Sequence, residues 1–212
     1  MRRLPVYLLL DTSGSMSGEP IEAVKNGVHM MIHSLRQNPQ AIETAFVSII
    51  TFDSDAQQII PLTDLASFQM VDIKASGMTS LGAALNLLAD KLENEVTRTT
   101  LEQKGDWKPI VFIMTDGVPT DDWQSGLNKL KSVNKGLVVG CAAGNGADDQ
   151  VLKQISDSVV RLNNTDAESI AKFFQWVSAS IATSSTKVEE TGIDLTKKDQ
   201  LPPPPSELVI IA

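Results

Sequence analysis

Apolar positions follow two different periods along this chain, and the two kinds of segment take turns. Short, nearly continuous apolar runs, beginning with Val6–Leu10, are typical of buried parallel strands. Between them, apolar residues recur every three or four positions, as on one face of a helix. This alternation predicts an α/β fold with a doubly wound, mostly parallel central sheet, helices on both faces and one antiparallel edge strand.

The same pattern gives approximate bounds for each element. We expect strands at 6–10, 43–51, 56–61, 109–114, 137–141 and 158–161, and helices at 19–36, 80–96, 121–132, 148–155 and 166–182. The second and third strands are separated only by Asp53-Ser54-Asp55, which predicts a hairpin turn.

The composition changes after Ala182. Residues 183–206 are rich in Ser, Thr, Lys and Glu and end in the prolines 202–205, which favour an extended conformation. Residues 208–212 are apolar again. We therefore expect a domain over 1–182 and a flexible, Pro-rich tail with an apolar end over 183–212. That end has two interpretations, a disordered terminus or a strand added to a sheet edge.

Composition narrows the class of protein. A chain of 212 residues that is 42% hydrophobic can bury a sizeable core. A formal net charge of −8 disfavours a nucleic-acid partner. The single cysteine, Cys141, excludes an internal disulfide and fits a reducing cytosol, and no segment approaches the roughly 18 apolar residues of a membrane span. We expect a cytoplasmic protein with no nucleic-acid or membrane partner.

Oxygen-bearing side chains occur where strands end and helices begin. They are Asp11, Ser13 and Ser15 after the first strand, Thr79 before the helix at 80–96, and Asp116 after the strand at 109–114. Loops at the carboxyl ends of parallel strands converge, so these residues should meet. Oxygen ligands without His or Cys suit a hard cation such as Mg²⁺ or Mn²⁺. Taken singly, each group also fits an ordinary helix cap or turn.

Together the three segments resemble the metal-ion-dependent adhesion site of von Willebrand factor A domains: D-x-S-x-S, then a threonine, then T-D-G. The resemblance covers about residues 4–182. It implies that Ser13 and Ser15 bind the metal directly, that Thr79 binds directly or through water, and that Asp11 and Asp116 act mostly through waters.

Two stretches, 4–16 and 115–123, further resemble the bacterial TerY-type proteins of tellurium-resistance operons. That family often has two glycines before the threonine, whereas Met78 replaces the second one here. The resemblance implies a role in tellurite and stress response. It also implies partners encoded nearby, among them a protein phosphatase and a protein kinase.

The resemblance to the adhesion site implies a non-enzymatic, metal-dependent protein-interaction module that binds an acidic residue of a partner through the cation. Neutral hydroxyl ligands leave most of the cation's charge uncompensated and therefore attractive to a carboxylate. The alternative is a Mg-dependent phosphohydrolase. Against it, Ser13 stands where a phosphoaspartate enzyme would carry its second aspartate, and the three loops contain no Lys or Arg to hold phosphate.

Four further aspartates surround the predicted site: Asp53, Asp55, Asp121 and Asp122. They form either a solvated surface or a rim that selects a partner with basic residues around its carboxylate. Trp123 has two interpretations as well, an exposed anchor on the metal face or a side chain packed beneath the loop.

Overall fold

The computed structural model describes residues 2–193 and 198–211. Its strands are β1 (Leu4–Asp11), β2 (Ala45–Phe52), β3 (Ala56–Asp64), β4 (Ile110–Thr115), β5 (Leu137–Ala143), β6 (Ser158–Leu162) and β7 (Val209–Ile211). Its helices are α1 (Glu19–Leu35), α2 (Pro39–Thr44), α3 (Leu81–Glu95), α4 (Trp123–Ser132), α5 (Asp149–Ile155) and α6 (Ala167–Thr191), with 3-10 turns η1 (Gly14–Met16) and η2 (Lys198–Gln200).

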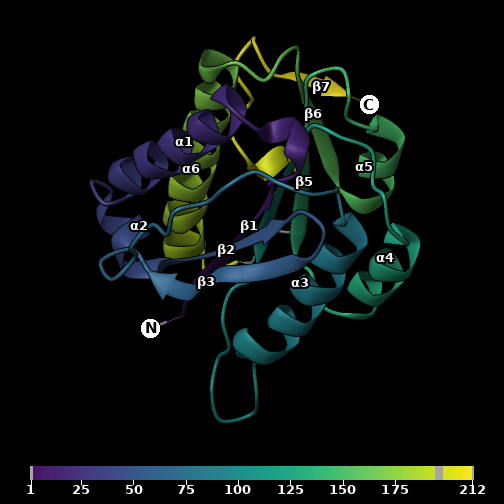
Figure 1. Cartoon of the computed structure of the whole chain (residues 1–212). Coiled ribbons are helices and arrows are strands. Elements are labelled where there is room, and N and C mark those ends of the chain that lie inside the picture. The colour runs from purple at the N-terminus through teal and green to yellow at the C-terminus, as the bar shows by residue number, and fades with distance from the viewer. Residues whose placement is uncertain (1, 194–197, 212) are drawn as a thin grey trace.

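The strands form one sheet in the order β3-β2-β1-β4-β5-β6-β7 (Figure 1). The five central strands are parallel, while β3 and β7 pair antiparallel with their neighbours. Helices α1, α2 and α6 pack on one face, and α3, α4 and α5 pack on the other. The predicted doubly wound α/β fold is confirmed, with an antiparallel strand at both edges rather than one.

Strand β1 shows why an apolar run predicts a central strand. All eight of its residues are buried, and its side chains alternate between the two cores. Leu8 and Leu10 contribute to the core beneath α1 and α6, and Tyr7 and Leu9 to the core beneath α3 and α4. A strand covered on both faces needs apolar side chains at consecutive positions.

Helix α2 was not expected from the pattern, because six residues are too few to show a helical period. Local chemistry accounts for it. The Asn38 side-chain oxygen accepts a hydrogen bond from the Ala41 N–H at 2.9 Å, and Pro39 occupies the first turn. An amide cap followed by proline is a typical helix start.

The end of the chain requires a correction. Helix α6 continues to Thr191, where Gly192 ends it in a left-handed conformation with φ of 64°. The predicted boundary at residue 182 therefore falls inside a helix and is wrong. Of the predicted tail, residues 194–197 and 212 lie outside the described residues.

The described part of the tail packs on the domain. Pro202 accepts a hydrogen bond from the Trp176 indole at 2.9 Å, and Leu208 is only 3% exposed. Strand β7 then pairs antiparallel with β6, with Val160 opposite Ile210. Of the two interpretations, the added edge strand is confirmed. Among the described residues, no helix has both the length and the apolar character needed to cross a bilayer.

Candidate metal centre

The predicted site lies where the sheet changes winding direction. Strands β1 and β4 are parallel neighbours, with Leu10 opposite Met114, but their following connections leave on opposite faces. Loops at such a point diverge and leave an open crevice at the carboxyl ends of the strands. Asp11 ends β1 and Asp116 directly follows β4, so both carboxylates come to this crevice.

Side chains from the two loops are in direct contact. The Ser13 and Ser15 hydroxyl oxygens lie 3.0 Å apart. The Ser15 hydroxyl donates to Asp116 Oδ1 at 2.7 Å, although the two residues are 101 positions apart in sequence. The structure thus brings together three of the five predicted ligands within hydrogen-bond distance.

Asp11 lies behind this group and is 0% exposed. Its Oδ1 accepts from the Ser13 backbone N–H at 2.8 Å, and its Oδ2 accepts from the Thr115 hydroxyl at 2.5 Å. The first bond holds the turn that presents Ser13. The sequence analysis included Thr115 only as the first residue of the T-D-G pattern and gave it no role, which the bond to Asp11 now supplies.

Thr79 arrives from the loop that precedes α3. Its hydroxyl oxygen lies 3.2 Å from where a β-carbon on Gly117 would stand, so Gly117 leaves the space that Thr79 occupies. Its carbonyl accepts from the Thr120 N–H at 2.9 Å, which ties its loop to the loop after β4. The five predicted residues are therefore neighbours, and their role as metal ligands stays a prediction.

Met78 is accommodated without strain in this loop. The left-handed residue is Gly77, with φ of 70°, and among the described residues every positive φ belongs to glycine. The Gly14 N–H donates to the Gly77 carbonyl at 3.1 Å, joining the loop to η1. The substitution instead places an apolar side chain, 57% exposed, beside the site.

The electrostatics of the site favour a cation. Burial raises the pKa of Asp11, and the charge of Asp116 adds to this, while hydrogen bonds from Ser13 and Thr115 oppose it. Burial likewise raises the pKa of Asp116, against the hydrogen bond from Ser15. Among the described residues, neither carboxylate makes an ion pair. Two neighbouring carboxylates with hydroxyls between them and no basic partner form a donor set that fits a hard divalent cation.

Two of the aspartates around the site, Asp121 and Asp122, cap helices, which the sequence analysis did not predict. Asp121 accepts from the N–H groups of Gly82 and Ala83 at 2.9 and 2.8 Å, which caps the start of α3. Asp122 accepts from the Ser125 N–H at 3.1 Å and caps α4. These two residues are neither a purely solvated surface nor free rim charges.

Trp123 is half-buried and packs against the core beneath α3 and α4. The packed interpretation of this residue is confirmed. The exposed apolar side chains beside the site are instead Met78 and Val118, each 57% exposed.

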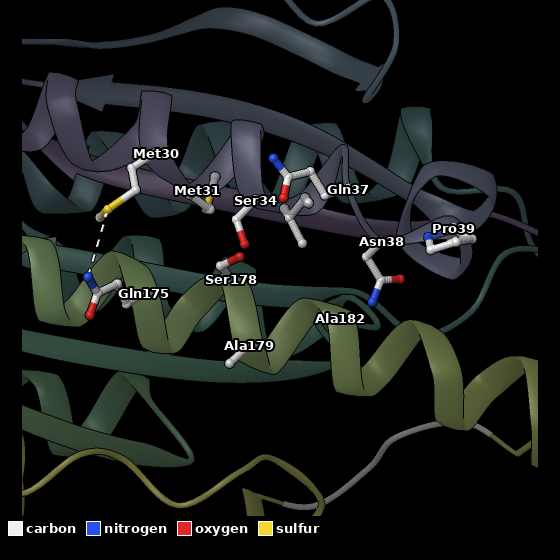
Figure 2. Close-up of a pocket in the computed structure, with 11 residues that line it drawn as sticks. Met30, Met31, Ser34, Gln37, Asn38, Pro39, Gln175, Ser178, Ala179 and Ala182 are labelled. Atoms are coloured by element: carbon white, nitrogen blue, oxygen red, sulfur yellow. Dashed lines mark hydrogen bonds between the residues drawn. The ribbon is translucent and has the colours of Figure 1, made fainter.

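The predicted metal site is an open cluster of oxygen atoms and not an enclosed pocket. A groove of about 440 Å³ lies elsewhere, between α1 and α6, as Figure 2 shows. The α6 side of this groove is made by Gln175 and the small residues Ser178, Ala179 and Ala182. None of the lining residues is charged or belongs to the predicted site. Ser15, by contrast, lies exposed on the surface. An open oxygen cluster is accessible to a side chain of another macromolecule.

A family model for the von Willebrand factor type A domain matches residues 6–176. The chain belongs to this family. Domains of the family often carry a metal-ion-dependent adhesion site, whose pattern of D-x-S-x-S, threonine and T-D-G has its counterpart in the cluster described above. A search among curated proteins gives no match.

Solved structures agree with this fold. Proximal thread matrix protein 1 from the mussel byssus is 19% identical with a TM-score of 0.65, covering 85% of this chain and 48% of its own. A von Willebrand factor type A protein from Catenulispora acidiphila is 16% identical with a TM-score of 0.64, covering 86% and 43%. A further structure of the mussel protein, also 19% identical with a TM-score of 0.64 and covering 85% and 48%, has a zinc-occupied adhesion motif. The chain spans about half or less of the length of these structures.

Proposed function

We propose that this chain is a non-enzymatic, metal-dependent protein-interaction module. In this proposal it binds Mg²⁺ or Mn²⁺ and, through the cation, an Asp or Glu side chain of a partner protein. The observation that carries the proposal is the contact of Ser13 with Ser15 and of Ser15 with Asp116, backed by the buried carboxylate of Asp11.

Each residue has a distinct task in this function. The hydroxyls of Ser13, Ser15 and Thr79 would hold the cation together with Asp11 and Asp116. The Asp11 carboxylate orients the turn by accepting a hydrogen bond from the Ser13 backbone N–H, and Asp116 accepts a hydrogen bond from the Ser15 hydroxyl and so orients that oxygen. When bound, a divalent cation supplies positive charge and an open position for an acidic group.

The donor set also supports this function over hydrolysis. Phosphoryl chemistry needs cationic groups to hold the transferring phosphate. Residues 11–18, 76–80 and 115–122 contain no Lys or Arg. The site therefore has the groups to attract one carboxylate, and it lacks the groups to clamp a phosphate.

We further infer a biological setting from the stretches at 4–16 and 115–123, which resemble TerY-type proteins. In this proposal the chain acts in the cytoplasm of a bacterium during tellurite or general stress response. A protein phosphatase or kinase encoded nearby would present the acidic residue. Electrostatic attraction between the acidic metal face of this chain and basic residues around the partner's carboxylate would favour the encounter.

Affinity capture with the purified chain tests the interaction. The bait would be used in Mg²⁺ and in EDTA, with the Ser13→Ala/Ser15→Ala variant and, as a matched control, Ser17→Ala from the exposed surface of the same loop. We expect a partner that is retained in Mg²⁺ by the wild type and by Ser17→Ala, and lost in EDTA and with the double variant. Capture that is equal under all conditions would contradict a metal-dependent module.

A further inference from the structure

The connection between α3 and β4 projects from the body of the molecule (Figure 1). Residues 97–104 are all exposed, and the tip carries Leu101 and Glu102 side by side. Leu101 is as exposed as in an extended chain, at 107%. One exposed leucine is ordinary on a protein surface. An apolar side chain beside a carboxylate at the tip of a projecting loop is a shape that can enter a site on another molecule.

Backbone hydrogen bonds close this loop at its tip and at its base. The Thr100 N–H donates to the Gln103 carbonyl at 2.9 Å, and the Asp106 N–H donates to the Thr97 carbonyl at 2.8 Å. Asp106 is also anchored by the Arg3 guanidinium, with Nη2 and Oδ2 2.6 Å apart. A loop that is already ordered loses less conformational entropy when it binds.

The metal face and the loop tip have complementary chemistry. The face offers an oxygen site for a carboxylate, the exposed apolar side chains of Met78 and Val118, and loops with aspartates but no Lys or Arg. The tip offers Glu102 beside Leu101. Two exposed basic residues, Arg98 and Lys104, flank that pair. Opposite charges on the two surfaces favour encounter and orientation.

The loop of one molecule cannot reach its own site. The loop base lies at the amino end of β1, where the Trp107 N–H donates to the Arg3 carbonyl at 2.8 Å. The metal site lies at the other end of the same eight-residue strand, at Asp11. Eight residues of extended strand separate the two ends by roughly 25 Å.

We propose that Glu102 of one copy of this chain docks on the metal site of a second copy. Leu101 then packs against Met78 and Val118 of that second copy. The inference rests on the metal-dependent function proposed above and names one ligand for the same site. The contact joins two different surfaces, so it produces head-to-tail assemblies that grow or close into rings.

Sedimentation velocity at several protein concentrations tests the proposal. In Mg²⁺ or Mn²⁺ we expect the average mass of the wild type to rise with concentration, and in EDTA we expect a monomer. Glu102→Gln should weaken the association at least about tenfold. Glu43→Gln is the matched control, because Glu43 is also an exposed carboxylate next to an exposed apolar residue, Ile42, but lies on α2. It should associate like the wild type.

A mixing experiment shows the direction of assembly. The Ser13→Ala/Ser15→Ala variant has an intact loop and no site, and Glu102→Gln has an intact site and no ligand. Each alone should remain monomeric in Mg²⁺, and an equal mixture should form dimers and nothing larger.

Metal titration by calorimetry separates the two proposals. If Mg²⁺ and Mn²⁺ bind the wild type but its mass stays that of a monomer, or if Glu102→Gln associates normally, self-docking is overturned and the module binds other partners only. If neither metal binds, the metal-dependent function is overturned and self-docking with it.

Discussion

Ser13 and Ser15 stand two positions apart in sequence but occupy different environments. Ser13 is 2% exposed and its backbone is held by Asp11, whereas Ser15 lies exposed and donates to Asp116. In the proposed site, Ser13 would therefore combine a structural role with a ligand role, and Ser15 would be a ligand without a packing role. This difference makes Ser15 the better position for testing metal binding alone.

Ser15→Ala should weaken Mg²⁺ binding at least about tenfold, because one oxygen of the cluster and the hydrogen bond that orients it are lost. The free energy of unfolding of the metal-free protein should change by less than about 0.5 kcal/mol, as for most exposed substitutions. Calorimetric titration and urea unfolding measure the two quantities, with Ser17→Ala as control. A variant with unchanged metal affinity would remove Ser15 from the ligand set.

Metal binding should fall off at a higher pH than for ordinary aspartates. The pKa values of Asp11 and Asp116 are raised chiefly by burial. Above those values each group is ionised in the metal-free protein, and its ionisation lowers the free energy of unfolding. Mg²⁺ binds the ionised forms, so the stabilisation by Mg²⁺ is complete above the raised pKa values and is lost as pH falls through them. Thermal unfolding with and without Mg²⁺ from about pH 3 to pH 8 checks this. A midpoint in the usual aspartate range of about 3.9 would contradict it.

At the scale of elements, the described C-terminal residues 198–211, called the strap below, connect α6 to the edge of the sheet. Trp176 on α6 donates to Pro202, Lys172 on α6 lies 3.7 Å from Glu207, and β7 pairs with β6. The strap contains the prolines 202–205 and the edge strand β7, and these contacts connect it to α6. Residues beyond the family match at 176 are thus part of the folded domain.

Leu208→Ala should lower the free energy of unfolding by about 2–3 kcal/mol, because Leu208 is 3% exposed within the core beneath α6. Val209→Ala is the neighbouring control, since Val209 is 50% exposed, and it should cost less than about 1 kcal/mol. Urea unfolding followed by tryptophan fluorescence measures the stability of both variants. A loss for Leu208→Ala as small as that expected for the control would contradict a contribution of Leu208 to stability.

At the scale of the whole molecule, the sheet separates two different ends. The carboxyl ends of β1 and β4 carry the oxygen cluster, while the amino ends carry the projecting loop anchored by Arg3 and Asp106. Because the central strands are parallel, the loops that follow them all lie at one edge of the sheet, and the loops that precede them all lie at the opposite edge. A molecule with a site at one end and a ligand-like loop at the other is suited to directional contacts.

Mg²⁺ should stabilise the whole fold, because the cluster joins loops that are distant in sequence and does not exist in the unfolded chain. At a Mg²⁺ concentration about 100 times the dissociation constant, the free energy of unfolding should rise by about 2.7 kcal/mol. Urea unfolding at low protein concentration measures this without self-association. The Ser13→Ala/Ser15→Ala variant should show no rise, and a rise of equal size in that variant would place the metal elsewhere.

The local pattern of the sequence was sufficient for the fold class and for most elements. The buried run of β1, the helical stripe of α1 and the order of elements all depend on contacts within or beside each segment, so they leave a period in the sequence. The short motif around Asp11 and Ser13, and the turn at Asp116, predicted a cluster because parallel strands bring such loops together.

Tertiary structure alone decided the remainder. The three residues of β7 are too few for a period, and their strand exists because β6 offers an open edge. Helix α6 passes residue 182 with Ser184 and Val188 buried, although serine is usually exposed. Beyond that residue the Lys187 ammonium donates to the Gln200 carbonyl, a contact between distant parts of the chain's end. The bond from Thr115 to Asp11 joins residues 104 positions apart, and no local pattern encodes such a pair. The sequence by itself determined the features made by near neighbours, and only the folded chain decided those that depend on distant surfaces meeting.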